Sequence, residues 1–458
     1  MKQLFSVLLI VLVIGMAEAQ EKPKAVSGGL GRTTALGGSP YNPYVQDYTD
    51  VFTNPAYAAW NKDLLFGELG NSFANQYVAP GQYAAYILGL GNLALGVAIG
   101  KREGPMFAEN AYGTGIFAWS DYMIPSINAN TPVATGEPLA PVQVFGAFKA
   151  GSLTIGAGLY RSWWSFLDDG TGSMGALQKL EISNNQTGFK GGILLELTPS
   201  VLVDAGVLFR INSSSGDFTD GNAGANPTAQ AYSATGTEIG VNGRIFMKFS
   251  DKLTLVPQVR FATFGYQPEL KDNTTPAPPT PVNNKPNDYG RTEFEVGIGA
   301  NSSFDGGWVT VGVAVQSISL SNDVTTQPGG AGTPLQTTKS TMSWFDLPKF
   351  NVGAEFDLLS WMKGRLGYFK RLSSMSTTTE PPSPGQKTET STSQEPGYIP
   401  SLGFSGAQQQ VSLGLGIILN RISIDGYVGE RVLAAGTWLL SGRAQDIFGV
   451  LSISVKFN

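Results

Sequence analysis

The sequence predicts an all-β protein: a transmembrane antiparallel β-barrel of roughly 14 to 16 strands with an N-terminal plug (hatch) inside its lumen. Three observations predict this fold class. The chain begins with an export signal, it continues as a series of segments in which apolar and polar residues alternate, and the connections between these segments are alternately short and long. Alternating segments of about ten residues, with short turns on one side and long loops on the other, are typical of outer-membrane barrels.

Residues 1–19 predict a cleaved secretory signal peptide. An apolar run at positions 4–16 follows Lys2, and the small-x-small triplet at 17–19 precedes Gln20. This apolar run is too short to serve as a membrane anchor. We therefore expect an exported protein and, given the barrel pattern, a location in the bacterial outer membrane.

The next stretch, residues 20–61, predicts the plug. It contains Ser27-Gly28-Gly29-Leu30-Gly31-Arg32 and, just before the first strand-like segment, Asn54-Pro55-Ala56. So many glycines and prolines exclude a long helix or a regular strand. Arg32 is the one charged residue between Ser27 and Gly38, so we expect it to anchor the plug to a lumen carboxylate such as Glu293, Glu295 or Glu355.

This order of residues resembles the N-terminal hatch of the FadL family of outer-membrane channels for long-chain fatty acids and hydrocarbons. The resemblance implies that the hatch blocks the lumen, that an apolar substrate binds inside, and that the N-terminal segment shifts to open a path. It also implies lateral exit near an early kinked strand, which glycines between Gly89 and Gly100 would permit. The hatch or gate residues implied by the resemblance are Ser27, Gly28, Gly29, Leu30, Gly31, Arg32, Asn54, Pro55 and Ala56.

The barrel is expected from residues 62–458. The clearest strands are 410–419 and 308–316, where one face is continuously apolar and the other is small or polar. In this register Val313 faces lipid, whereas Gly312 faces the lumen and should tolerate serine. The predicted strands are 63–71, 81–90, 93–101, 142–149, 152–163, 188–197, 201–213, 235–249, 253–265, 290–303, 308–320, 345–357, 361–372, 405–419, 421–433 and 443–457. The predicted long loops are 102–141, 164–187, 213–234, 266–289, 321–343 and 373–404.

Composition excludes most chemistry. The chain has 458 residues, no His, no Cys and 14% charged residues, against roughly 25% in ordinary globular domains. The usual catalytic triads, zinc sites and thiol nucleophiles are therefore absent. Glu293 and Glu295 share a strand face, but we interpret them as lumen carboxylates and not as a glycosidase pair. We expect no enzyme and no cofactor, and the net charge of -5 gives no support for nucleic-acid binding.

Polar strand faces that also carry aromatic side chains predict a lumen for an amphiphilic ligand. Aromatic rings suit an apolar body, and a guanidinium suits an acidic head. In the alternative interpretation, which the sequence leaves open, these arginines neutralise neighbouring lumen acids and hold the plug. The ligand-binding candidates are Arg210, Arg244, Arg260, Arg365, Phe246 and Phe264.

The expected function is passive uptake of hydrophobic solutes, either long-chain fatty acids or hydrocarbons, gated by the hatch. Two alternatives remain: a general porin for small hydrophilic solutes, and a FadL-like non-transporting partner barrel of a secretion system. Expected partners are the apolar ligand, outer-membrane lipid or lipopolysaccharide, and the barrel-assembly machinery. The machinery would read the C-terminal strand, in which the terminal aromatic, Phe457, is penultimate.

Overall fold

The computed structural model describes eleven stretches of the chain, and every structural statement below concerns these residues. They are residues 25–38, 41–70, 83–101, 141–171, 177–220, 228–272, 288–326, 336–380, 388–392, 409–429 and 450–457. No helix among them is long and apolar enough to cross a membrane.

The described chain is three short helices followed by seventeen strands. The helices are α2 (Leu30–Ala35) and the two 3-10 helices η1 (Tyr48–Phe52) and η2 (Pro55–Ala59). The strands are β1 (Leu64–Gly70), β2 (Tyr83–Leu90), β3 (Leu93–Ile99), β4 (Val142–Ala150), β5 (Leu153–Thr171), β6 (Leu177–Thr198), β7 (Val201–Asp220), β8 (Thr228–Ser250), β9 (Leu253–Asp272), β10 (Asp288–Phe304), β11 (Gly307–Thr326), β12 (Gln336–Leu359), β13 (Met362–Glu380), β14 (Thr388–Thr392), β15 (Gln409–Leu419), β16 (Ile422–Gly429) and β17 (Val450–Lys456).

Sixteen of the strands close into an antiparallel barrel, as the alternation predicted. Each strand pairs with its neighbours in sequence, and β1 closes the ring by pairing with both β2 and β17. The remaining strand, β14, pairs only with the outer part of β13, while the lower part of β13 pairs directly with β15. Sixteen is therefore the number of strands in the ring, and β14 is an addition to it.

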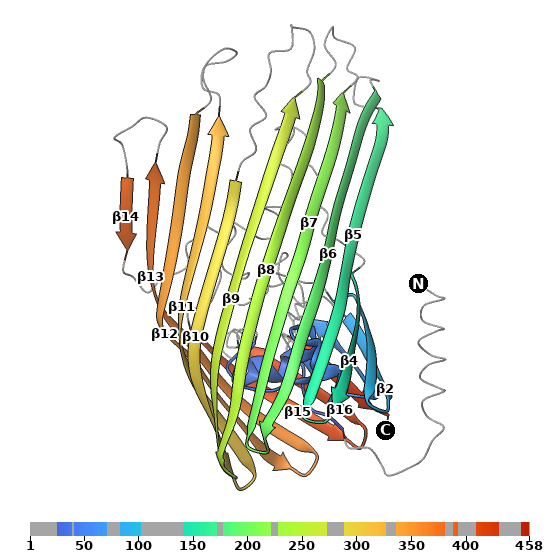
Figure 1. The fold of residues 1–458 in the computed structure, drawn as a ribbon, viewed down its shortest axis with the longest axis vertical. Helices are drawn as coiled ribbons and strands as arrows, with labels where there is room; N and C mark the ends of the chain where they lie inside the picture. Colours follow the sequence, from blue (N-terminus) through green and yellow to red (C-terminus); the bar gives the residue numbers. More distant parts are fainter. Residues whose placement is uncertain are drawn as a thin grey trace, which may run out of the picture.

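Strand length divides the ring into a tall part and a short part (Figure 1). Strands β5 to β13 have 17 to 24 residues, whereas the described parts of β1 to β4 have 7 to 9. The prediction of long loops at 164–187 and 213–234 is wrong over most of their length, because β5 to β8 continue through them. Above the membrane neither strand face must be apolar, so the alternation disappears while backbone pairing persists.

An apolar belt with two aromatic borders surrounds the barrel. Phe294 and Phe304 are both exposed on β10, and the span of about ten residues between them is that of a membrane-crossing strand. Neighbouring strands continue both borders, since Phe294 pairs with Phe261 at one level. Exposed aromatics at the turn end are Phe148, Phe249, Phe304 and Trp361, and those at the opposite border are Phe189, Phe209, Phe261, Phe294 and Phe345. Such borders mark the two membrane interfaces.

The expected early kinked strand is not present in the described residues. β3 pairs with β2 and with β4 without a register shift, and Gly96 lies within this regular ladder. Away from the turns, register shifts occur instead in the pairs β11–β12 and β12–β13, next to Pro348, which has no N–H to donate to the ladder. Further shifts lie at the turn ends of β6–β7, β8–β9 and β12–β13. Glycine content alone therefore did not locate the irregular part of the wall.

Candidate functional site: the occupied lumen

The N-terminal segment, which the structure describes at residues 25–38 and 41–60, lies inside the ring of strands (Figure 1). Its contacts reach opposite sides of the wall. The Leu30 N–H donates to Glu68 on β1 at 2.7 Å, and the Tyr44 hydroxyl donates to the Val313 carbonyl on β11 at 3.1 Å. Lys190 on β6 donates to the Phe52 carbonyl at 2.6 Å. The segment therefore fills the lumen at the level of the apolar belt.

The first half of the segment, residues 25–38, is bound largely through its backbone. The N–H groups of Gly28 and Gly31 donate to Asp425 at 3.1 Å and to Ser452 at 2.9 Å. A Cβ atom at Gly31 would overlap the Asp425 carbonyl oxygen, and Gly29 has a φ of 94° that favours glycine. The glycines at positions 28, 29 and 31 are therefore required because the backbone of the segment packs directly against the barrel wall there.

Arg32 is the centre of an ion-pair cluster. Its guanidinium contacts Glu355 on β12 at 3.1 Å and Asp47 of the segment at 3.3 Å. Glu355 also pairs with Arg365 on β13 at 2.8 Å, and Arg365 reaches Asp425 on β16 at 2.6 Å. Of the three lumen carboxylates expected for Arg32, the structure therefore selects Glu355.

The second half of the segment, residues 41–60, turns sharply at Asn54. The Asn54 side chain accepts from the Ala56 N–H at 3.0 Å and donates to Asp204 on β7 at 2.6 Å. Pro55 begins η2, where its fixed φ suits a first helical position. The corner thus satisfies its own backbone and also attaches the segment to the wall.

Arg244 on β8 anchors this second half. Its guanidinium contacts Asp204 at 2.7 Å and Asp50 at 3.0 Å, and it donates to the Tyr41 hydroxyl at 2.6 Å. Tyr57 donates to Asp204 at 2.9 Å. The charged groups Arg244, Asp204 and Asp50 are all buried, so a charge left without its partner here would be costly.

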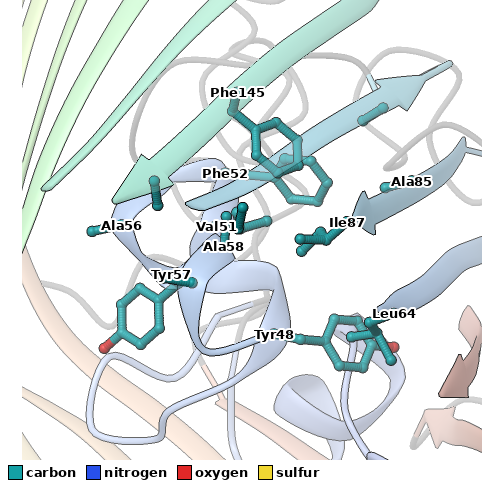
Figure 2. Close-up of a cluster of buried hydrophobic side chains, with 14 of the residues drawn as sticks. Tyr48, Val51, Phe52, Ala56, Tyr57, Ala58, Leu64, Ala85, Ile87 and Phe145 are labelled. Atoms are coloured by element: carbon teal, nitrogen blue, oxygen red, sulfur yellow. The ribbon is translucent and has the colours of Figure 1, made fainter. Parts of the chain in front are cut away.

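The other side of the second half is apolar, with Tyr48, Phe52 and Tyr57 among its side chains (Figure 2). Phe52 packs edge-on against Tyr83 with ring centroids 5.3 Å apart, and the ring centroid of Tyr48 lies 4.7 Å from that of Phe66. Most of this apolar cluster comes from η1, η2 and strands β1 to β4. Its buried members are Tyr48, Val51, Phe52, Ala56, Tyr57, Ala58, Ala59, Leu64, Phe66, Tyr83, Ala85, Ile87, Ala94, Ala98, Phe145, Ala147 and Leu194. The lumen therefore has one apolar side and one charged side.

Burial changes the acidity of Asp47 in the segment. Desolvation raises its pKa to about 6, although Arg32 and the N–H groups of Thr49 and Gly29 favour the charged form. Burial also raises the pKa of Asp50, against the effect of Arg244. Both carboxyls therefore bind protons more readily in the docked segment than in water.

The predicted ligand-binding residues all face inward but do not form one site. Arg244 and Arg260 lie over Tyr41, with their guanidiniums 5.9 and 5.8 Å from its ring centroid, and Arg244 also lies 5.3 Å from the ring centroid of Phe246. Arg210 pairs with Glu238 at 3.0 Å, next to Phe264 on the following strand. Arg365 belongs to the Arg32 cluster, and Arg260 contacts Glu295 at 3.8 Å.

Sequence reasoning missed several residues that hold the segment. Asp204 interrupts the apolar residues of β7, and a charge within a membrane-crossing strand was a usable signal for it. Tyr44 had no such signal. It packs against Gly312, which faces the lumen as predicted, and a Cβ there would overlap the Tyr44 ring, so serine at this position would disturb the segment. Val313 faces outward as predicted, with 38% of its surface exposed.

No family model and no curated protein matches this sequence. Solved structures that match include the Pseudomonas putida toluene transporter TodX, at 10% identity and a TM-score of 0.37, covering 95% of this chain and 100% of that chain. The monoaromatic hydrocarbon channel CymD matches at 11% identity and a TM-score of 0.35, covering 94% and 98%. The ferric citrate transporter FecA matches at 8% identity and a TM-score of 0.33, covering 80% of this chain and 65% of that chain. Because these scores are low, the fold assignment rests on the strand pairing described above.

Proposed function

We propose that this chain is an outer-membrane channel for passive uptake of hydrophobic solutes, with residues 20–61 as its hatch and 62–458 as its barrel. The observation that carries the proposal is a closed ring whose lumen is filled by a separate segment, with aromatic and aliphatic side chains along one side. A general porin needs an open polar pore, which this segment obstructs. A lumen closed by its own chain, with an apolar side, suits gated transfer of apolar solutes.

The paired arginines favour an uncharged hydrocarbon over a fatty acid. Arg210, Arg244, Arg260 and Arg365 each already face a carboxylate of the protein. A ligand carboxylate would have to displace one of these acids and leave it buried without its partner, which is costly. A neutral apolar solute meets no such cost. TodX and CymD carry toluene and monoaromatic hydrocarbons, the same class of solute.

The outer membrane is the proposed location because of the apolar belt and its aromatic borders. Exposed side chains such as Val311 and Ile298 require a hydrocarbon environment. The signal peptide at 1–19 lies outside the described residues and remains a prediction. Contact of the belt with lipid or lipopolysaccharide, and recognition of β17 by the barrel-assembly machinery, belong to the same proposal.

Transport into vesicles tests the proposed function. Purified protein in liposomes should accelerate entry of an uncharged aromatic hydrocarbon above the rate of protein-free vesicles, and should not accelerate swelling in sugar solutions. A long-chain fatty acid offered in parallel should enter more slowly than the hydrocarbon. Rapid sugar swelling would identify a general porin. If neither solute enters faster than in protein-free vesicles, the remaining interpretation is a non-transporting partner barrel.

A further inference from the structure

The two halves of the N-terminal segment lie against chemically different surfaces. We call residues 25–38 the latch, and we call the side chains that hydrogen-bond or ion-pair with it the cradle. The cradle consists of Asn42, Asp47, Glu68, Asn351, Glu355, Arg365, Ser412, Asp425, Ser452 and Ser454. All but Asn42 and Asp47 belong to the barrel wall.

The cradle is acidic and rich in hydroxyl groups. Four of its members are carboxylates (Asp47, Glu68, Glu355 and Asp425), and Arg365 is its one cation. The latch itself brings in Arg32 between Asp47 and Glu355, while Lys363 contacts Glu355 and Lys101 interacts with Glu68 at the margins of the cradle. Removing the latch removes Arg32 and leaves the acids in excess.

Glu68 gives an independent sign that the cradle has unused capacity to bind a cation. One carboxylate oxygen accepts the Leu30 N–H at 2.7 Å, so the group points toward the latch. Its other oxygen, Oε2, is buried and accepts no hydrogen bond from the described residues. The Tyr83 hydroxyl and the Lys101 ammonium group both interact with Glu68 from outside the latch. A buried carboxylate oxygen that accepts no hydrogen bond is a position that a donor or a cation can satisfy.

The apolar cluster does not depend on the latch. Its segment residues run from Tyr48 to Ala59, and from the latch only Val26 packs at its margin. Arg244 and Asp204 hold the second half of the segment through Asp50, Asn54 and Tyr57. Release of the latch therefore leaves the apolar side of the lumen closed.

We infer that release of the latch alone opens a hydrophilic, cation-selective path through the lumen. This path is lined by the part of the wall that is formed by β1 and by strands β12 to β17. Rings of carboxylates confer cation selectivity because they lower the energy of a partly dehydrated cation and raise that of an anion. The cations nearest the turn end of this path, Lys363, Arg421 and Lys456, are partly solvent-exposed, so salt screens them more than the cradle acids. The inference rests on the hatch role proposed above.

Single-channel recording in asymmetric KCl tests the inference. A variant lacking residues 20–38 should conduct where the intact protein is closed, with a reversal potential near that of K⁺ and a permeability ratio of K⁺ to Cl⁻ of about five or more. In the deletion variant, Glu355→Gln with Asp425→Asn should bring the ratio close to one. Asp251→Asn, in a turn where the side chain is fully exposed, is the matched control and should leave the ratio unchanged.

A full-length variant guards against misfolding of the deletion variant. Gly31→Trp should displace the latch, because even a Cβ there overlaps the Asp425 carbonyl oxygen, and it should show the same cation preference. A synthetic peptide of residues 25–38, added to the deletion variant, should block the current. The same peptide carrying Gly31→Ala should block at least tenfold less well, since one methyl group is already too large.

The outcomes separate the inference from the proposed function. Conductance without cation preference in both variants would overturn the cation path while leaving residues 20–61 as a hatch. No conductance in either variant would overturn the inference and remove residues 25–38 from the gate. Faster hydrocarbon entry on deletion of residues 20–38 would contradict the claim that the apolar side stays closed. Unchanged hydrocarbon entry together with cation selectivity would support it.

Discussion

At the scale of single residues, two arginines anchor the N-terminal segment, Arg32 in its first half and Arg244 against its second half. Arg32 comes from the segment and meets wall acids, whereas Arg244 comes from the wall and meets segment acids. Both side chains are nearly buried, so the favourable contribution of each pair is small beside the cost of breaking it. Removing either arginine should therefore have a larger effect than adding a new ion pair elsewhere.

Arg32→Ala should loosen the latch. It leaves Glu355 with Arg365 but takes the cation from Asp47, so we expect docking to weaken by about 3 kcal/mol, the lower end of the range for a broken buried pair. The expected result is higher permeability to small hydrophilic solutes, read as single-channel conductance. Arg161→Ala, at an exposed site on β5, is the control and should conduct like the intact protein. Equal conductance of the Arg32 variant and the intact protein would contradict the anchor role.

The acidity of Asp47 predicts that docking depends on pH. Its pKa is raised from 3.8 to about 6 in the docked segment, so docking takes up a proton between these values. The added stability is fully present below pH 3.8 and is lost as pH rises through 6. Between pH 5 and pH 7 docking should weaken by about 1 kcal/mol, seen as a several-fold rise in open probability. Asp47→Asn should reduce this rise, and a steeper rise in that variant would refute the assignment.

At the scale of the strand, β11 shows what each face requires. Val313 faces lipid, so Val313→Arg should cost about 2–4 kcal/mol and impair membrane insertion, measured by unfolding in urea from lipid vesicles. Gly312→Ser should leave insertion intact, because that position faces the lumen. It should instead displace Tyr44 and increase conductance, since a Cβ overlaps the ring. Equal insertion defects in both variants would mean that the two faces are not distinct.

Membrane-crossing strands were predictable from the sequence, and their extensions were not. Within the belt one face must be apolar, so residues 308–316 and 410–419 alternate and were recognised. In the outer part of β12, around residues 336–343, Ser and Thr occupy both faces and the pattern ends although pairing continues. The lumen-facing candidates, such as Arg210 and Arg365, were likewise predictable, because successive residues of a strand point to opposite faces. Their partners come from distant strands or from the segment, and only the assembled fold shows those.

At the scale of the whole molecule, the ring closes without β14. This strand pairs with one neighbour only, whereas β15 pairs with β13 and β16. Thr390→Pro should therefore leave the temperature of barrel unfolding unchanged, because the ring keeps all its hydrogen bonds. Leu413→Pro in β15 should lower that temperature clearly, since it removes a ladder hydrogen bond from a doubly paired strand. Heat-dependent mobility on detergent gels reports both, and equal shifts would place β14 within the ring.

The latch also contacts the seam where the first and last strands of the barrel meet. Leu30 is bound by Glu68 of β1, while Gly31 and Val26 are bound by Ser452 and Ser454 of β17. The latch thus contacts both β1 and β17, the two strands whose pairing closes the ring. This pairing can form only after the C-terminal strand has been synthesised. During assembly the latch would bind both strands at once and hold the C-terminal strand next to the N-terminal strand. Docking of the latch in the lumen and closure of the ring would therefore occur together. A chain without its latch should fold into the closed barrel slowly, even where the completed barrel is stable.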